Sequence, residues 1–181
     1  VDMAKHSSVP VINALSDESH PCQALADAMT LMDEFGRELS GRTIAFVGDG
    51  NNVARSLCIL CAMLSMKFIL AAPTGYELKP QFIEQLRQKM PGLRLESTAD
   101  PFESVRSADA IYTDTWVSMG QEEDSSQRRA DFDGYQVNDR LVEAAQEHTI
   151  VMHCLPAYRN VEITDEVMDG SRSRVMAQAH N

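Results

Sequence analysis

The sequence predicts an α/β fold with a doubly wound parallel sheet and helices on both faces. Short apolar runs of strand length alternate with helical segments along most of the chain. Strands that alternate with helices in this way are joined by right-handed crossovers, so they lie parallel in one sheet. Polar loops directly follow three of these runs, at residues 48–52, 114–120 and 153–156, which is where open parallel sheets bind ligands. The expected arrangement is Rossmann-like.

The elements follow from apolar periodicity and from residues that begin or end helices. The first long helix carries Leu25 and Met29 on one face and stops at Gly36. Two later helices begin with proline in the first turn, and Asn138 is a suitable N-cap for another. Strands are predicted at 43–47, 67–72, 93–96, 110–113 and 149–152, and helices at 20–36, 53–66, 80–90, 100–108, 138–147 and from 164.

The segment 121–133 is the most polar part of the chain. It contains a run of charges that is typical of a solvated surface, and this is the favoured interpretation. A lid over the neighbouring loop at 114–120 is the alternative. The charged residues are Glu122, Glu123, Asp124, Arg128 and Arg129.

The composition argues against several classes of protein. Hydrophobic residues make up 44% and charged residues 24% of the 181 residues, as in ordinary soluble domains. With 16 Lys and Arg against 27 Asp and Glu, the net charge of −11 argues against a broad nucleic-acid surface or an anionic membrane surface. No apolar run approaches the roughly 20 residues of a membrane span, and no signal peptide is visible. A cytoplasmic protein that binds small molecules is expected.

The cysteines indicate a reduced protein without a structural metal. Cys58 and Cys61 form a Cys-x-x-Cys pair, but they lie inside a predicted helix among apolar residues, so burial as small hydrophobes is favoured. The sequence has no second pair to complete a zinc site. No metal is therefore predicted.

The loop at 48–52 follows the first predicted central strand and has competing interpretations. It partly matches the Gly-x-Gly-x-x-Gly dinucleotide fingerprint, but Val53 or Ala54 stands at the third glycine and no acidic residue ends the next strand. The amides of Asn51 and Asn52 can instead donate to a carboxylate and accept from an ammonium group. A tight turn explains the same residues equally well.

His20 and Gln23 stand three residues apart at the start of the predicted 20–36 helix, so they share one face. Free N–H groups and the helix dipole favour an anion there. The two side chains can hold a carbonyl or phosphate oxygen, or they are a capping His and an exposed Gln. Further candidates for the cap are Ser16, Asp17 and Ser19.

Two loops place polar side chains after the later strands. Asp114 offers a carboxylate to an ammonium group, with the hydroxyl of Ser118 nearby in sequence, while Trp116 is expected to be a packing anchor. Cys154 has three open interpretations: a buried hydrophobe, a nucleophile or a thiol that shares a proton. His153 precedes it on the strand and is expected to point to the opposite face, so no Cys–His pair is predicted.

Taken together, these motifs resemble those of the ornithine carbamoyltransferases. The resemblance runs from about His20 to Asn181, and its 114–122 and 153–156 motifs are specific. Aspartate carbamoyltransferases are similar at His-Pro-x-Gln but carry Pro where Cys154 stands. The matching segments are His-Pro-Cys-Gln-Ala-Leu-Ala-Asp at 20–27, Gly-Asp-Gly-Asn-Asn at 48–52, Asp-Thr-Trp-Val-Ser-Met-Gly-Gln-Glu at 114–122 and His-Cys-Leu-Pro at 153–156.

The resemblance implies a role for each matching residue. His20 and Gln23 would contact the carbamoyl group of carbamoyl phosphate. The amino-acid end of ornithine would be held by Asn52, Asp114, Ser118 and Met119. Cys154 and Leu155 would line the reaction centre, the Leu155–Pro156 bond would be cis, and Asp114 and Cys154 would share the handling of the proton.

The implied reaction transfers the carbamoyl group of carbamoyl phosphate to the δ-amine of L-ornithine, giving L-citrulline and phosphate, as in arginine biosynthesis. It requires no cofactor and no metal. The enzyme must align two substrates, stabilise an oxyanion and favour the neutral form of an amine with an ordinary pKa near 10.4. The family also implies a homotrimer, with no nucleic-acid or membrane partner.

The resemblance further implies that residues 1–181 form a single ornithine-binding domain. In that family a Ser-Thr-Arg-Thr-Arg segment of an N-terminal domain binds carbamoyl phosphate, and the printed sequence contains no such segment. The family's Ala-Glu-Asn-Arg segment reads Ala179-His180-Asn181 here, and the final C-terminal helix is also expected to be absent. The isolated chain is therefore expected to be inactive.

Three alternatives stay open from the residues. Another amine acceptor, such as putrescine or N-acetylornithine, would keep the fold and the mechanism, although the Ser-Met-Gly loop disfavours both. A dinucleotide-binding dehydrogenase domain is supported by Gly48 and Gly50 alone. A non-catalytic paralogue that binds an amino acid is the third.

Overall fold

The computed structural model describes residues 2–117 and 122–181. Its centre is a five-stranded parallel sheet in the order β3-β2-β1-β4-β5. The strands are β1 (Thr43–Val47), β2 (Lys67–Ala71), β3 (Arg94–Thr98), β4 (Ala110–Thr113) and β5 (Ile150–His153). Since the chain moves outward from β1 to β3 and then returns to β4 beside β1, the sheet is doubly wound. The predicted fold class is confirmed.

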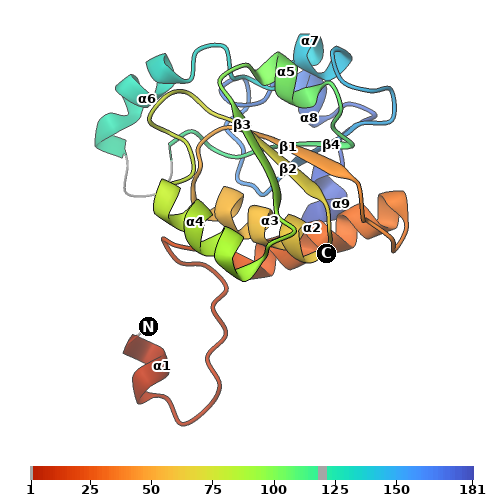
Figure 1. Cartoon of the computed structure of the whole chain (residues 1–181). Helices are drawn as coiled ribbons and strands as arrows, with labels where there is room; N and C mark the ends of the chain where they lie inside the picture. The colour runs from red at the N-terminus through yellow and green to blue at the C-terminus, as the bar shows by residue number, and fades with distance from the viewer. Residues whose placement is uncertain (1, 118–121) are drawn as a thin grey trace.

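Helices cover both faces of this sheet (Figure 1). One layer holds α2 (Pro21–Phe35), α3 (Asn52–Met63), α4 (Pro80–Lys89) and α9 (Val175–His180), and the other holds α5 (Pro101–Val105), α7 (Asp139–Glu143) and α8 (Asp165–Met168). The short helices η1 (Glu122–Asp124) and α6 (Ser125–Asp131) lie to one side of these layers. At the N-terminus, α1 (Asp2–His6) extends away from the rest of the fold. None of the helices in the described ranges is long and apolar enough to cross a membrane.

The sheet separates two hydrophobic cores. Phe46 and Tyr112 stack at 5.4 Å between ring centroids in the core shared with α2 and α3, where Leu57 is fully buried. Ile111 and Val151 point into the second core, under α5, α7 and α8. All residues of β1, β4 and β5 are buried, which is why these strands are continuous apolar runs in the sequence. Each fully buried aliphatic side chain contributes about 1.5–3 kcal/mol.

Capping explains where several helices begin and end. Asn138 accepts a hydrogen bond from the N–H of Leu141, as predicted, and begins α7. This helix ends at Glu143, before the predicted residue 147, and the Arg172 guanidinium donates to the carbonyls of Val142 and Gln146 at this end. The predicted caps of α2 are wrong: His20 is the N-cap residue without a side-chain cap, and its N–H donates to Ser56 Oγ at 2.8 Å.

Candidate active site

Three strand-end loops meet at the carboxyl ends of β1, β4 and β5, where the strand order reverses. The loop after β1 carries Asp49 and Asn51, Asp114 follows β4, and Cys154 follows β5. Ligands bind at such a reversal in open α/β sheets. The expectation that these polar loops lie together is confirmed.

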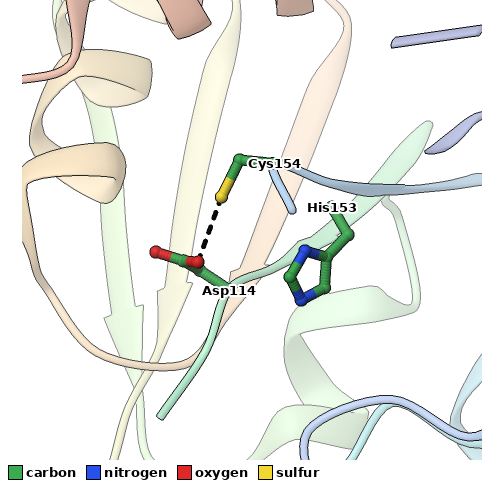
Figure 2. Close-up of side chains that lie close together, drawn as sticks. All are labelled: Asp114, His153 and Cys154. Atoms are coloured by element: carbon green, nitrogen blue, oxygen red, sulfur yellow. Dashed lines mark hydrogen bonds between the residues drawn. The ribbon is translucent and has the colours of Figure 1, made fainter. Parts of the chain in front are cut away.

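Asp114 is the centre of the site. Its Oδ1 accepts hydrogen bonds from the Cys154 thiol at 3.0 Å and from the N–H of Thr115 at 2.7 Å. Its Oδ2 accepts from the Asn51 amide at 2.8 Å. Figure 2 shows the Cys154 sulfur pointing at the carboxylate. Since Asp114 is 8% exposed, these donors replace water around its charge.

Cys154 is a protonated thiol in this setting. Burial and the negative charge of Asp114 raise the pKa of Cys154 well above its ordinary value. A thiolate is the nucleophilic form of cysteine, so the environment disfavours nucleophilic catalysis. The thiol instead holds its proton on a carboxylate oxygen, which supports the interpretation of Cys154 as a proton-sharing group.

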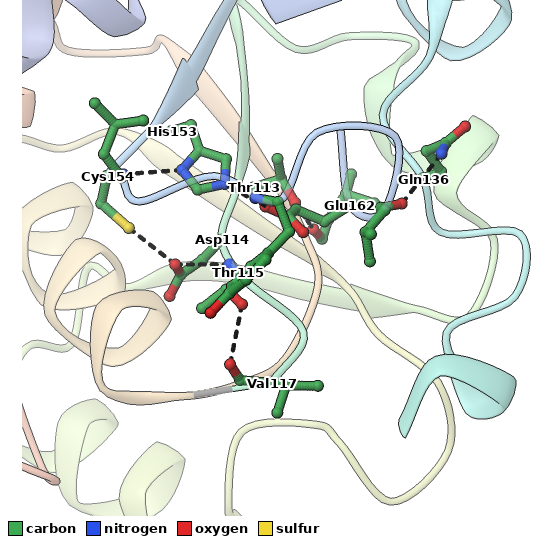
Figure 3. Close-up of polar contacts among 12 residues, drawn as sticks. Thr113, Asp114, Thr115, Val117, Gln136, His153, Cys154 and Glu162 are labelled. Atoms are coloured by element: carbon green, nitrogen blue, oxygen red, sulfur yellow. Dashed lines mark hydrogen bonds and ion pairs between the residues drawn. The ribbon is translucent and has the colours of Figure 1, made fainter. Parts of the chain in front are cut away.

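His153 makes no hydrogen bond with Cys154 in the described ranges, so the two form no Cys–His pair, as predicted, and its ring instead supports the loop through Leu155 and Glu162 (Figure 3). Its Nδ1 accepts from the N–H of Leu155 at 2.9 Å, so Nε2 carries the hydrogen that reaches Glu162 Oε1 at 3.1 Å. The same Oε1 accepts from the N–H of Tyr158 at 2.6 Å. Because both side chains of the His153–Glu162 pair are fully buried, the loop that bears Cys154 has a rigid support.

Asp114, His153 and Cys154 also present metal-ligand atoms within 4.8 Å of one another. The hydrogen bonds argue against a metal site at this position. Both ring nitrogens of His153 are already engaged in hydrogen bonds with Leu155 and Glu162. A metal needs a free lone pair on a neutral imidazole, so this set is unsuited to one.

The asparagine that contacts Asp114 is Asn51, whereas the resemblance assigned the amino-acid end of ornithine to its neighbour Asn52. Asn51 is the N-cap of α3: its Oδ1 accepts from the N–H groups of Val53 and Ala54, both at 3.0 Å. This leaves its amide hydrogens for Asp114. Asn52 donates to the carbonyl of Ser16 at 2.7 Å. A cap at a strand-end loop is the sequence signal that identifies Asn51.

Arg128 is a second residue that sequence reasoning missed. It lies on α6, is 8% exposed, forms an ion pair with Asp49 and donates to the carbonyl of Trp116. Its guanidinium also lies 4.8 Å from the Tyr76 ring centroid. The interpretation of 121–133 as a solvated charged face is therefore wrong at Arg128, because a partly buried carboxylate from a distant loop pairs with it. Burial, partly offset by Arg128, raises the pKa of Asp49.

Of the remaining predicted residues, three have described positions and two lie outside the described part of the chain. Gln23 donates to the carboxylate of Asp27 at 2.9 Å, and His20 Nδ1 is buried without a partner in the described part of the chain. Leu155 precedes a cis peptide bond to Pro156, as expected. Ser118 and Met119 lie outside the described residues.

Two packing predictions are confirmed near the site. Trp116 is a packing anchor, since its ring stacks on Phe132 at 5.5 Å between centroids. Cys58 and Cys61 are both fully buried in the core, and burial raises the pKa of Cys58 to about 12. They are therefore small hydrophobic residues without redox character.

Gly50 lets the β1 loop approach the segment before α4. Its N–H donates to the Tyr76 carbonyl at 2.7 Å, and an added Cβ would lie 2.6 Å from the backbone nitrogen of Leu78. We expect Gly50→Ala to lower the free energy of unfolding by about 1–3 kcal/mol, because backbone must shift to make room. Urea unfolding followed by the fluorescence of Trp116, the only Trp of the chain, measures this effect.

Gly92→Ala is the matched control, since no atom lies within 4 Å of an added Cβ at that position. It is expected to change the free energy of unfolding by less than about 0.5 kcal/mol. Equal effects of the two substitutions would contradict the close approach at Gly50.

Comparison with known proteins gives consistent matches over the whole chain. Residues 40–181 match the family model described as "Aspartate/ornithine carbamoyltransferase, Asp/Orn binding domain", and residues 1–33 match that of the "carbamoyl-P binding domain". The ornithine carbamoyltransferase of Methanosarcina acetivorans is 50% identical over 179 residues, covering 99% of this chain and 58% of that protein. The ornithine carbamoyltransferase of Caldicellulosiruptor saccharolyticus is 47% identical over 182 residues, covering 99% of this chain and 59% of that protein.

Solved structures give the same picture. The ornithine carbamoyltransferase from Pyrococcus furiosus superposes with a TM-score of 0.91 at 47% identity, covering 99% of this chain and 57% of that one. The enzyme from Thermus thermophilus superposes with a TM-score of 0.86 at 41% identity, covering 99% and 57%. The chain thus spans just under three fifths of the length of the relatives it matches.

Proposed function

Since the chain belongs to the aspartate/ornithine carbamoyltransferase family, we propose that it supplies the ornithine half of the active site of an ornithine carbamoyltransferase. The enzyme would transfer the carbamoyl group of carbamoyl phosphate to the δ-amine of L-ornithine, giving L-citrulline and phosphate. The observation that carries the proposal is the carboxylate of Asp114 held between the Cys154 thiol and the Asn51 amide. Neither the matching family models nor the relatives named above are dehydrogenases.

Asp114 and Cys154 form the proposed proton-handling pair. The attacking δ-amine must lose a proton, because an ammonium has no lone pair. A fixed carboxylate attracts the amino groups of ornithine, and a thiol hydrogen-bonded to it can pass a proton between the amine and the carboxylate. The geometry fits this role, since Oδ1 contacts the thiol while Oδ2 and Asn51 form the other side of the carboxylate. Asn52, Ser118 and Met119 are proposed to complete the amino-acid end, and Leu155 to line the reaction centre.

The carbamoyl group is proposed to lie against His20 and Gln23. Both residues fall within 1–33, the part that matches the carbamoyl-P binding model. His20 Nδ1 is buried without a partner in the described ranges, and a substrate oxygen would satisfy it. The remainder of the carbamoyl phosphate site is proposed to belong to a carbamoyl-phosphate domain joined to this ornithine-binding domain. A cytoplasmic homotrimer that acts in arginine biosynthesis is proposed for the whole enzyme.

Citrulline formation tests the proposal. The full-length protein that contains this chain is assayed with carbamoyl phosphate and with ornithine, putrescine, N-acetylornithine or aspartate, beside the 181-residue chain. We expect turnover of ornithine by the full-length protein alone, because half of the site is supplied by the other domain. Turnover of another acceptor in place of ornithine would show that the proposed substrate is wrong. Saturable NADH binding without turnover would favour a dehydrogenase, and saturable ornithine binding without turnover a non-catalytic paralogue.

A further inference from the structure

A buried carboxyl group lies behind the proposed site without being part of it. Asp27 is on α2 and is fully buried. It faces Tyr112 of β4 and Gln178 of α9, and one turn earlier on its own helix it faces Gln23. We call these four residues the Asp27 cluster. Burying a charged group is unfavourable unless hydrogen bonds compensate, so such a residue calls for a specific reason.

The hydrogen bonds of the Asp27 cluster converge on a single oxygen. Asp27 Oδ1 accepts from Gln178 Nε2 at 2.7 Å, from Gln23 Nε2 at 2.9 Å and from the Tyr112 hydroxyl at 3.2 Å. Gln178 in turn accepts the N–H of His153 on its Oε1 at 2.9 Å. Asp27 therefore connects the helix that carries Gln23 to the strand that leads into Cys154.

The carboxylate determines how the Gln23 amide is oriented. Asp27 Oδ1 also accepts hydrogen bonds from Gln178 and Tyr112, so this oxygen is an acceptor and Gln23 must turn its NH₂ group toward it. Its Oε1 then points away from Asp27, and this oxygen makes no hydrogen bond within residues 2–117 and 122–181. A ligand group that contacts Oε1 must be a donor. The carbamoyl group has such a donor, its NH₂, whereas an acetyl group has a methyl there.

We propose that Asp27 is a positioning residue: its carboxylate fixes Gln23 with the amide oxygen outward, so that the site selects a carbamoyl NH₂ over a methyl group. The proposal rests on the proposed function, because it assigns Gln23 to the carbamoyl group. The second carboxylate oxygen, Oδ2, is buried without a partner in the described part of the chain, an arrangement that stability alone does not favour.

The test compares two ligands that differ only at this position. Phosphonoacetamide carries an NH₂ on its carbonyl carbon, and 2-oxopropylphosphonate carries a methyl. Their inhibition constants against carbamoyl phosphate are measured at pH 8 with the full-length protein, and the ratio of the two constants is the readout. Because a misplaced donor or acceptor weakens binding by about 10-fold or more, Asp27→Leu should reduce the preference for the amide by about 10-fold.

Two further variants separate positioning from folding. Asp27→Asn keeps an acceptor oxygen in the place of Oδ1, so the ratio should stay within about 3-fold of the wild type. Thr30→Val removes another buried polar group of α2, which bonds to the Ala26 carbonyl and to Asn181 and does not touch Gln23. It should leave the ratio unchanged. If Asp27→Leu does not fold, Asp27→Ser replaces it, because the serine hydroxyl is too short to reach Gln23. This variant is expected to show the same reduction in the preference for the amide.

The outcomes are distinct. An unchanged ratio in Asp27→Leu or Asp27→Ser overturns the proposal, and so does an equal loss in Asp27→Asn, since that variant retains the acceptor. A loss confined to the variants without an acceptor supports it. If the wild type binds neither phosphonate, the proposed function itself fails. If it binds both equally, the proposed function stands and the role of Asp27 is wrong.

Discussion

Replacing Asp114 by Asn in the full-length protein is expected to lower kcat/KM for ornithine by about 10³-fold. The carboxylate is nearly buried and receives hydrogen bonds from Cys154, Thr115 and Asn51. An Asn loses the charge that attracts an amino group, and its NH₂ would face either the Asn51 amide or the Cys154 thiol, both of which are donors. In the proposed complex, Asp114 forms a charge pair with an amino group of ornithine. Losing one member of such a buried pair costs about 2–5 kcal/mol, and a 10³-fold loss lies within this range. Initial rates of citrulline formation at varied ornithine measure the change.

Asp131→Asn is the control for this substitution. Asp131 is a carboxylate of α6 that accepts from the Tyr76 hydroxyl at 2.7 Å and does not contact Asp114. We expect a change of less than about 3-fold, because an amide oxygen can replace the acceptor. A comparably small effect of Asp114→Asn would contradict the central role of that carboxylate. A loss seen only in KM would assign it to substrate binding without a part in proton handling.

The sequence was most informative where burial is complete. β1 and β4 are continuous apolar runs because both of their faces are covered, and this pattern identified the strands and therefore the positions of the loops after them. Once the strands are parallel, residues that directly follow them meet at one edge of the sheet. The proximity of Asp114 to Cys154 is a consequence of this geometry, although 40 residues separate them.

Contacts that depend on tertiary packing were not predictable in the same way. Whether Asn51 or Asn52 turns toward Asp114 depends on which of the two caps α3, a difference of one residue. Arg128 belongs to a polar, charged segment, and only the fold brings Asp49 to it. Asp27 stands among the apolar residues of an amphipathic helix, so the sequence does not show that its partners come from β4 and α9.

Asp27 is also expected to make the stability of the chain depend on pH. Burial raises the pKa of Asp27 from 3.8 to about 7, against the opposing hydrogen bonds from Gln23, Gln178 and Tyr112. Between pH 3.8 and about pH 7, the folded state therefore keeps a proton that the unfolded state has lost. The resulting stabilisation is complete below pH 3.8 and disappears as the pH rises through about 7. The nearby charge of Asp114 raises the pKa of Asp27 further.

Asp27→Asn removes this titration. Relative to the wild type, the free energy of unfolding of the variant should rise by roughly 2–3 kcal/mol between pH 5 and pH 8. Urea unfolding of the 181-residue chain, followed by Trp116 fluorescence at several pH values, measures the difference. Each value is taken between variant and wild type at the same pH, so the titration of other groups largely cancels.

Glu34→Gln supplies the control on the same helix. A hydrogen bond from Arg174 lowers the pKa of Glu34, so Glu34 is ionised in both the folded and the unfolded state between pH 5 and pH 8. The difference in the free energy of unfolding between Glu34→Gln and the wild type should therefore stay constant from pH 5 to pH 8. A constant difference for Asp27→Asn as well would mean that the buried carboxyl group is ionised throughout. Its hydrogen bonds from Gln178, Gln23 and Tyr112 would then outweigh the loss of solvation.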